Sequence, residues 1–194
     1  MVGGWTAAAD LQPHFDQVAD TVSSLAAPGA TDRWVMTLTF LVVGVCYVVT
    51  GLALRPARAA GRLILITGAA LGTLVAANPE HAGIAYPAGH IIWASIGLAG
   101  LTFWPAGAWR RGPRVPWGLR PAVAAAAVAL LLAVLAWFVA ELVTGAGQVG
   151  LAERAAGVVQ AAWPLAVVLS CRRPAGRYRT EPVPAGAVTQ TRAA

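Results

Sequence analysis

Apolar and polar positions alternate along the chain in long blocks, not at the short periods of a soluble fold. Five stretches with few or no charges are separated by short groups of charged and turn-forming residues. Each is long enough for a helix that crosses the ~30 Å hydrocarbon core of a bilayer. The pattern predicts an all-α, polytopic transmembrane helix bundle over residues 34–173, with its spans at 34–54, 59–78, 90–108, 122–143 and 151–171.

The segments on either side of this bundle have different patterns. Within residues 1–33, an apolar stretch too short to cross precedes the segment 15–27, where apolar residues recur at helical spacing. We expect a short amphipathic helix there, lying on the outer face of the bundle. Residues 174–194 are rich in Pro, Gly, Thr and Arg and contain almost no large apolar side chain, which predicts a disordered cytoplasmic tail.

The composition agrees with a membrane class. Hydrophobic residues make up 58% of the chain and charged residues 11%, where a soluble domain carries roughly 25% charged residues. Five spans and their loops nearly use up the 194 residues, so no separate soluble domain is expected. The basic residues lie in short groups between apolar runs and not on one polar face, so the net charge of +6 does not indicate nucleic-acid binding.

The charges also predict an orientation. All 14 basic residues are arginines, and eleven of them fall at the three connections expected on one side: Arg55, Arg58, Arg62, Arg110, Arg111, Arg114, Arg120, Arg172, Arg173, Arg177 and Arg179. Seven of the eight acids fall on the other side. The positive-inside rule therefore places the arginine-rich side and the C-terminus in the cytoplasm, with the bundle in the bacterial plasma membrane.

Two motifs carry a resemblance to a known family. The first is Asp-x-x-x-Asp-Thr-x-Ser-x-Leu-Ala at Asp16 to Ala26, followed by Ala-Thr-Asp-Arg-Trp-Val-Met at 30–36. The second is Gly-Leu-Ala-Glu-Arg at 150–154, followed by Gln-x-x-Trp-Pro at 160–164. Over residues 3 to about 173 the chain resembles the bacterial and archaeal membrane proteins catalogued as domain of unknown function 998. The resemblance implies a helical membrane fold and no established activity.

The resemblance further implies a complete span before the first motif, which would make six in all. Only the outer end of that span, at residues 3–11, is present in this sequence. Two explanations stay open: the start codon is assigned too late, or this version of the protein lacks the helix. The orientation of the other spans is the same in both cases.

Seven polar residues are expected together at the outer interface, and they form the candidate site: Asp20, Ser23, Arg33, His90, Glu141, Glu153 and Arg154. If they converge, they form an outward-facing pocket. The alternative is a set of helix caps and ion pairs at the interface. In that case Arg33 and Arg154 each need a carboxylate, because both lie where a span begins and are partly removed from water.

Three classes of function follow from these residues. The first is a structural or binding protein whose outer polar cluster binds lipid headgroups, so that its partners are membrane lipids; protein partners and the oligomeric state are not indicated. The second is a lipid-modifying hydrolase that uses Ser23, His90 and an acid, although no Gly-x-Ser-x-Gly elbow surrounds Ser23. The third is a small transporter, suggested by Gly-rich helices and by Pro164 within the last span.

The sequence does not identify a catalytic residue, and neither a cofactor nor a metal is expected. His81 and His90 have no Cys or third His beside them, so their spacing matches no common zinc site. No phosphate-binding loop or dinucleotide-binding fingerprint occurs in the sequence. A transporter also usually needs an ionisable residue near the middle of a span, and none of the expected spans has one.

Overall fold

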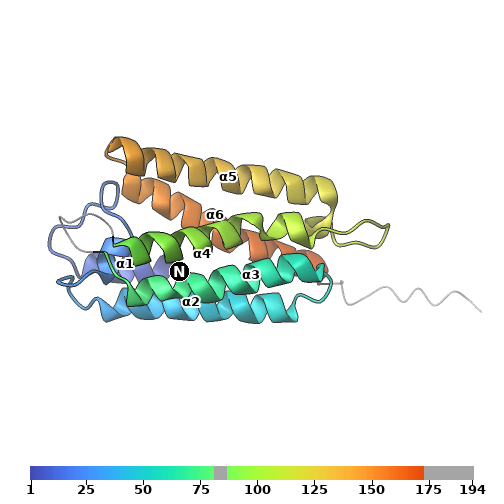
Figure 1. Ribbon diagram of the computed structural model, residues 1–194, viewed down its shortest axis with the longest axis horizontal. Coiled ribbons are helices and arrows are strands. Elements are labelled where there is room, and N and C mark those ends of the chain that lie inside the picture. The colour runs from blue at the N-terminus through green and yellow to red at the C-terminus, as the bar shows by residue number, and fades with distance from the viewer. Residues whose placement is uncertain (81–86, 173–194) are drawn as a thin grey trace, which may run out of the picture.

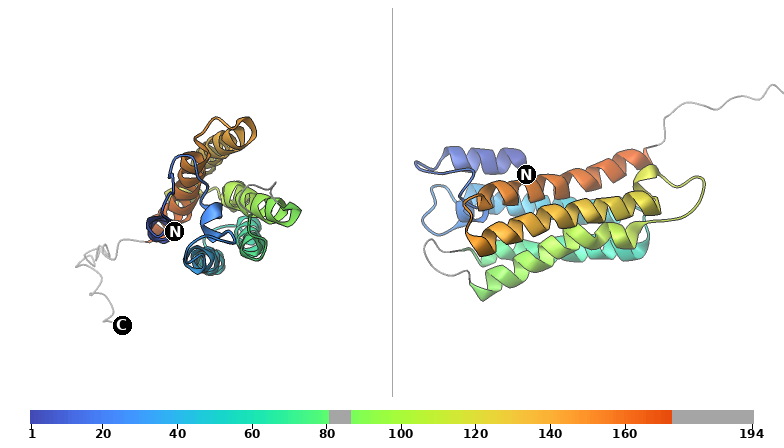
Figure 2. Two further views of the ribbon diagram at one scale, coloured as in Figure 1. Left: turned by 90° about the vertical axis from the view of Figure 1, so that its left-hand side faces the viewer. Right: turned by 90° about the horizontal axis from the view of Figure 1, so that it is seen from above.

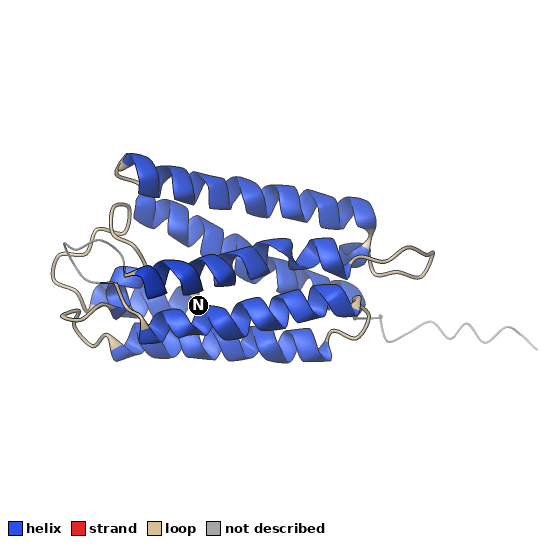
Figure 3. Ribbon diagram, viewed as in Figure 1, coloured by secondary structure: helices blue, strands red, loops and turns tan. Residues whose placement is uncertain are grey.

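The computed structural model describes residues 1–80 and 87–172, and all regular structure in that part of the chain is helical (Figure 3). Five long helices run side by side (Figure 1). They are α2 Trp34–Ala53, α3 Ala59–Gly72 continued by the 3-10 segment η2 Thr73–Ala77, α4 Ala88–Ala108, α5 Pro121–Thr144 and α6 Val149–Cys171. All five are long and apolar enough to cross a membrane, which makes the chain a multi-pass membrane protein.

The bounds of these helices lie close to the predicted spans. The largest differences are at two helix starts, where α4 begins at residue 88 instead of 90 and α6 begins at 149 instead of 151. The ends of α5 show why such bounds can be read from a sequence. Pro121 stands at the first helical position, where its missing N–H is not needed, and Gly145 closes the helix with a left-handed φ of 64°.

The connections between the helices gather at two ends of the bundle. We call the end that carries residues 11–33 and 145–148 the capped end, and the end that carries residues 54–58 and 109–120 the arginine end (Figure 1). The helices α4 and α6 begin at the capped end, and α5 begins at the arginine end. The chain therefore passes up and down through the bundle.

The N-terminal segment forms a helix, α1 Val2–Asp10, that packs at the edge of the bundle beside α2 and α6 (Figure 2). Gly4 of α1 lies directly against Thr39 of α2, and a Cβ on Gly157 of α6 would lie 2.8 Å from Met1 Cε. At ~1.5 Å per residue, a helix of nine residues is about 14 Å long, which is roughly half of a membrane span. It fills only the capped half of the gap between its neighbours.

The prediction of an amphipathic helix over residues 15–27 is wrong. That segment consists of turns, followed by the short 3-10 helix η1 Ser23–Ala26. The carboxylate of Asp16 accepts the backbone N–H groups of Val18 at 2.8 Å and Ala19 at 3.2 Å. Such side-chain bonds to the following backbone stabilise a turn at the expense of a helix. The segment folds as a loop that covers the capped end.

Helices α3 and α4 pack against each other through glycines. A Cβ on Gly68 would lie 2.6 Å from Gly100 Cα, and a Cβ on Gly72 would lie 2.8 Å from Gly97 Cα. No larger side chain fits at these contacts without movement of the backbone. Contacts between small residues are the usual way in which membrane helices approach each other closely.

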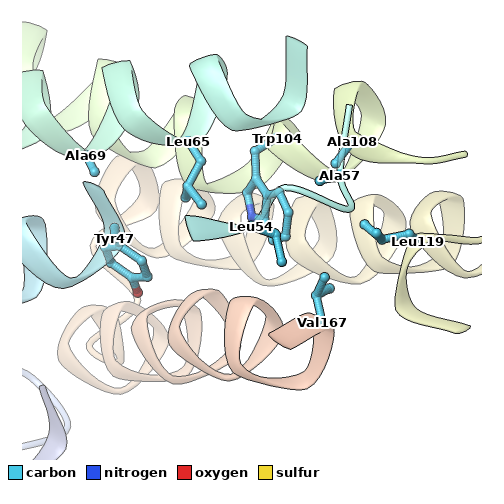
Figure 4. Close-up of a cluster of buried hydrophobic side chains, with 9 residues drawn as sticks. All are labelled: Tyr47, Leu54, Ala57, Leu65, Ala69, Trp104, Ala108, Leu119 and Val167. Carbon is cyan, nitrogen blue, oxygen red and sulfur yellow. The ribbon is translucent and has the colours of Figure 1, made fainter. Parts of the chain in front are cut away.

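Two clusters of buried hydrophobic side chains stabilise the packing of the helices, one toward each end of the bundle. The cluster at the arginine end joins α2, α3, α4 and α6 around Trp104, Leu65 and Leu119 (Figure 4). The second cluster joins α1 and η1 to the start of α2 at the capped end: Trp5, Ala8, Ala9, Val22, Leu25, Ala26 and Met36. The tail predicted for residues 174–194 lies outside the described residues.

Candidate functional site

A cavity of about 350 Å³ lies among the helices, and all five long helices and Met1 contribute to its lining. Most of its wall is apolar, with Phe40, Leu98, Leu101 and Phe138 among the larger side chains. Volumes of about 300–1,000 Å³ with a mainly apolar lining and a few polar groups are typical of sites for small ligands. The polar side chains in the wall of this cavity are therefore the groups most relevant to the binding of a small ligand.

The polar lining residues are concentrated toward the capped end. Thr21 and Ser23 come from the loop before α2, and Glu80 from the connection before α4. His90 lies in the first turn of α4, and Glu153 is the fifth residue of α6. These residues are far apart in the sequence, and the helix starts and the capping loop bring them to one end of the cavity. Gln160 and Tyr47 add polar groups deeper along the helices.

Glu153 fixes the capping loop to α6. Its carboxylate accepts a hydrogen bond from the Ser23 hydroxyl at 3.1 Å and a second one from the backbone N–H of Val22. Both carboxylate oxygens are thus occupied. Hydrogen bonds to a charged acceptor are stronger than neutral ones, so Glu153 determines where residues 22 and 23 lie above the cavity.

Arg154 holds the same loop from the other side. Its Nη1 donates to the backbone carbonyls of Gln17 at 2.7 Å, Gly150 at 2.9 Å and Asp20 at 3.0 Å, and its guanidinium lies over the Phe15 ring at 5.2 Å. The side chain is buried, and its Nε and Nη2 have no hydrogen-bond partner. Arg154 therefore acts as a clamp on main-chain carbonyls.

Glu80 is the most unusual group of the cavity. It is 8% exposed, and its Oε1 accepts the Thr21 hydroxyl at 2.8 Å. Its Oε2 is buried and has no hydrogen-bond partner among the described residues. Burial raises the pKa of Glu80, and the bond from Thr21 and the nearby charge of His90 oppose this shift in part. His90 directs Nδ1 at the Asn78 carbonyl at 2.9 Å, so that nitrogen carries a proton.

Two further buried polar side chains line the cavity at mid-depth. Gln160 is 3% exposed, and its Nε2 donates to Thr102 Oγ1 at 3.3 Å and to the Leu98 carbonyl at 3.4 Å. Within the described residues the hydroxyl of Tyr47 has no hydrogen-bond partner, and it is directed toward α6 (Figure 4). Unpaired buried polar groups are rare in native structures.

The structure brings together part of the predicted cluster. Ser23, His90 and Glu153 all line the cavity, and Arg154 is hydrogen-bonded to the Asp20 carbonyl in the loop that carries Ser23. The remaining two residues of the predicted cluster do not join them.

Glu141 accepts the backbone N–H of Gln148 at 3.0 Å and the indole N–H of Trp137 at 3.4 Å, so it closes the turn after α5. Arg33 is exposed at the start of α2. Within the described residues, neither Arg33 nor Arg154 forms an ion pair, so the predicted pairing with Glu141, Glu153 or Asp20 is wrong. Main-chain carbonyls take the place of the carboxylate for Arg154.

Ser23 and His90 do not form the hydrogen bond that a serine nucleophile needs. The Ser23 hydroxyl donates a hydrogen bond to the Glu153 carboxylate, and His90 Nδ1 faces a backbone carbonyl. In a nucleophilic hydrolase, the base accepts the proton of the hydroxyl that attacks. The observed geometry instead gives Ser23 a structural bond in the capping loop.

Four polar residues of the lining were not among the predicted site residues: Thr21, Glu80, Tyr47 and Gln160. Glu80 gave no local signal, because its partner Thr21 is 59 positions away in the sequence. Gln160 offered a signal, since a lone amide in an apolar span is costly unless it is hydrogen-bonded. Thr21 also lies within the first family motif, and Gln160 within the second.

Five membrane-crossing helices around a cavity with a polar cap define a multi-pass helical membrane protein with an internal ligand-sized site. A family model described as protein of unknown function DUF998 matches residues 1–170. Because this match covers most of the chain, the protein belongs to that family, as the two motifs indicated. No curated protein and no solved structure matches the chain.

Proposed function

We propose that the protein binds a membrane amphiphile, with the apolar chain of the ligand inside the cavity and its headgroup at the capped end. The observation that carries this proposal is the distribution of polarity in the cavity. Its wall is apolar along the helices and polar where Thr21, Ser23, Glu80 and Glu153 meet. A molecule with one apolar and one polar part matches this distribution, and the surrounding bilayer is a large supply of such molecules.

The contacts of the capping loop support the same proposal. Glu153 and Arg154 fix residues 17–23 above the cavity through hydrogen bonds to both side chain and backbone. A site whose polar groups are held in place loses little entropy when a ligand binds. The loop thus forms a rigid polar lid for the headgroup, and the helices form the channel for the chain.

The test is binding of tritiated 1-decanol to purified protein in a scintillation proximity assay. Ala94 lines the cavity on α4, and a phenyl ring at this position fills part of it. Ala94→Phe is therefore expected to abolish saturable binding. Ala99 lies on the same helix, is exposed and is not part of the lining, so Ala99→Phe is the matched control and should bind like the unmodified protein. Equal binding by both variants contradicts the proposal.

We also propose that the capped end faces outward and the arginine end lies in the cytoplasm of a bacterial cell. The connections at the arginine end include Arg55, Arg58, Arg110 and Arg111, as the positive-inside rule requires. In a variant without Cys46 and Cys171, a cysteine at exposed Ala146 is expected to react with an impermeant thiol reagent in intact cells, and one at exposed Arg114 is not. The opposite labelling pattern contradicts this orientation.

A further inference from the structure

We infer that the headgroup bound at the capped end is cationic, an ammonium group that lies between the carboxylates of Glu80 and Glu153. This inference rests on the proposed function, because it names the class of amphiphile that the cavity takes. It adds two details, the charge of the ligand headgroup and the carboxylate oxygen that contacts this headgroup.

The hydrogen bonds of the two carboxylates leave one oxygen open. Glu153 accepts the Ser23 hydroxyl on one oxygen and the Val22 N–H on the other. Thr21 Oγ1 accepts the Ser24 N–H, so its own proton is available for Glu80 Oε1. Glu80 Oε2 is the fourth oxygen, and it is buried without a hydrogen-bond partner in the part of the chain that the structure describes. Glu80 itself is only 8% exposed and lines the cavity.

The capping loop keeps the two carboxylates near each other. Thr21 bonds Glu80 and Ser23 bonds Glu153, and these two loop residues are separated by a single position. Two residues of extended chain cover at most about 7 Å, so both acids are held at neighbouring points of the same short segment. A cation placed between them is attracted by both.

No arginine contributes to the described lining of the cavity. Arg154 is next to Glu153 in the sequence, but its Nη1 is bonded to the carbonyls of residues 17, 20 and 150, and it is not part of the cavity lining. Among the described residues the lining contains no arginine, while both acids and His90 contribute to it. Carboxylates in an apolar site are unstable as anions unless a cation or hydrogen-bond donors compensate them. An ammonium group supplies a positive charge together with N–H donors, one of which suits Glu80 Oε2.

The experiment compares decylamine, 1-decanol and decanoate, which share one chain and differ in the head. Binding of each tritiated probe to the purified protein is measured at neutral pH by scintillation proximity. We expect decylamine to bind at least about tenfold more tightly than 1-decanol, the ratio that about 1.4 kcal/mol provides, and decanoate to bind most weakly. This comparison uses the unmodified protein, so it does not depend on whether a variant folds.

Two variants then locate the preference. Glu80→Gln keeps the size of the side chain and removes its charge, so decylamine should lose its advantage while 1-decanol binding is retained. Glu141→Gln is the matched control, because Glu141 lies at the capped end but is bonded to Gln148 and Trp137 and does not line the cavity. It should keep the full preference for the amine.

The outcomes separate this inference from the proposed function. Equal affinity for the three probes, or a preference for decanoate, overturns the cationic headgroup while leaving an amphiphile site intact. A preference for the amine that survives Glu80→Gln also overturns the assignment to Glu80. Loss of all saturable binding, with Ala94→Phe and Ala99→Phe indistinguishable from the unmodified protein, overturns both proposals together.

Discussion

The hydroxyl of Ser23 donates a hydrogen bond to the carboxylate of Glu153 at 3.1 Å, although 130 positions separate the two residues in the chain. Each belongs to one of the two motifs by which the chain resembles its family. The bond therefore joins the two segments that carry the resemblance: one forms the loop over the cavity and the other forms the start of α6, which holds that loop. The motifs are parts of a single structural unit.

This contact predicts energetic coupling between the two residues. Ser23→Ala should lower the free energy of unfolding by about 1 kcal/mol, and Glu153→Gln by about 1–3 kcal/mol, since a bond to a charged group is lost in each case. Because both substitutions remove the same bond, the double variant should lose less than the sum of the single losses. Thermal unfolding of the four proteins in detergent measures this cycle, and strict additivity would show that the residues act independently.

The two arginines at the capped end, Arg154 and Arg33, are expected to contribute differently to the free energy of unfolding. Arg154→Gln removes three hydrogen bonds from a buried guanidinium to backbone carbonyls, and a loss of at least about 2 kcal/mol in unfolding free energy is expected. Arg33→Gln is the matched control, because Arg33 is exposed and such substitutions usually change stability by less than about 0.5 kcal/mol. Equal effects of the two substitutions in a thermal unfolding assay would contradict the clamp role of Arg154.

Glu80 predicts a pH dependence of stability. Burial raises its pKa above the ordinary value of 4.5, so the folded protein binds the proton more tightly than the unfolded chain does. The contribution of the protonated Glu80 side chain to stability is therefore complete below pH 4.5, and it is lost as the pH rises through the raised pKa of Glu80. Melting temperatures measured from pH 4 upward should fall faster for the unmodified protein than for Glu80→Gln. Parallel curves for the two proteins would argue against this role.

The glycine contacts predict where a single methyl group is not tolerated. A Cβ at Gly68 would lie 2.6 Å from Gly100 Cα, so Gly68→Ala must push α3 and α4 apart and should cost about 1–3 kcal/mol. Gly3 has no atom within 4 Å of such a Cβ, which makes Gly3→Ala the matched control. It should leave stability unchanged or slightly higher, because Ala favours helix more than Gly. A similar melting temperature for the two variants would show that the α3–α4 contact is looser than described.

The long helices were predictable because their signal is local. Uninterrupted apolar stretches, Pro121 at a helix start and the arginines after three of the five spans fix the bounds without knowledge of the packing. The segment 15–27 was not predictable in the same way. Val22 and Leu25 are buried as the helical spacing suggested, but Val18 is 44% exposed, because the Asp16 side chain bonds the backbone N–H of Val18 and turns the chain there.

The site was predictable only where the residue type itself carried the signal. Ser23, His90 and Glu153 were identified as polar groups expected at one end, and the cavity brings them together. Arg154 was assigned a carboxylate partner, since a sequence displays side-chain charges and does not display which backbone carbonyls are left open. Glu80 was missed because its importance arises from burial, which depends on the position of the capping loop.

The most direct test of the central claim is to find where the chain of a bound amphiphile lies. A decylamine that carries a diazirine near the end of its chain can be photolysed on the purified protein, and the labelled residues identified by mass spectrometry. The account predicts labelling of cavity-lining residues such as Leu98, Leu101 and Phe138, with protection by excess decylamine. Labelling confined to exposed residues on the outside of the bundle, such as Leu38, Val45 and Leu165, would contradict it.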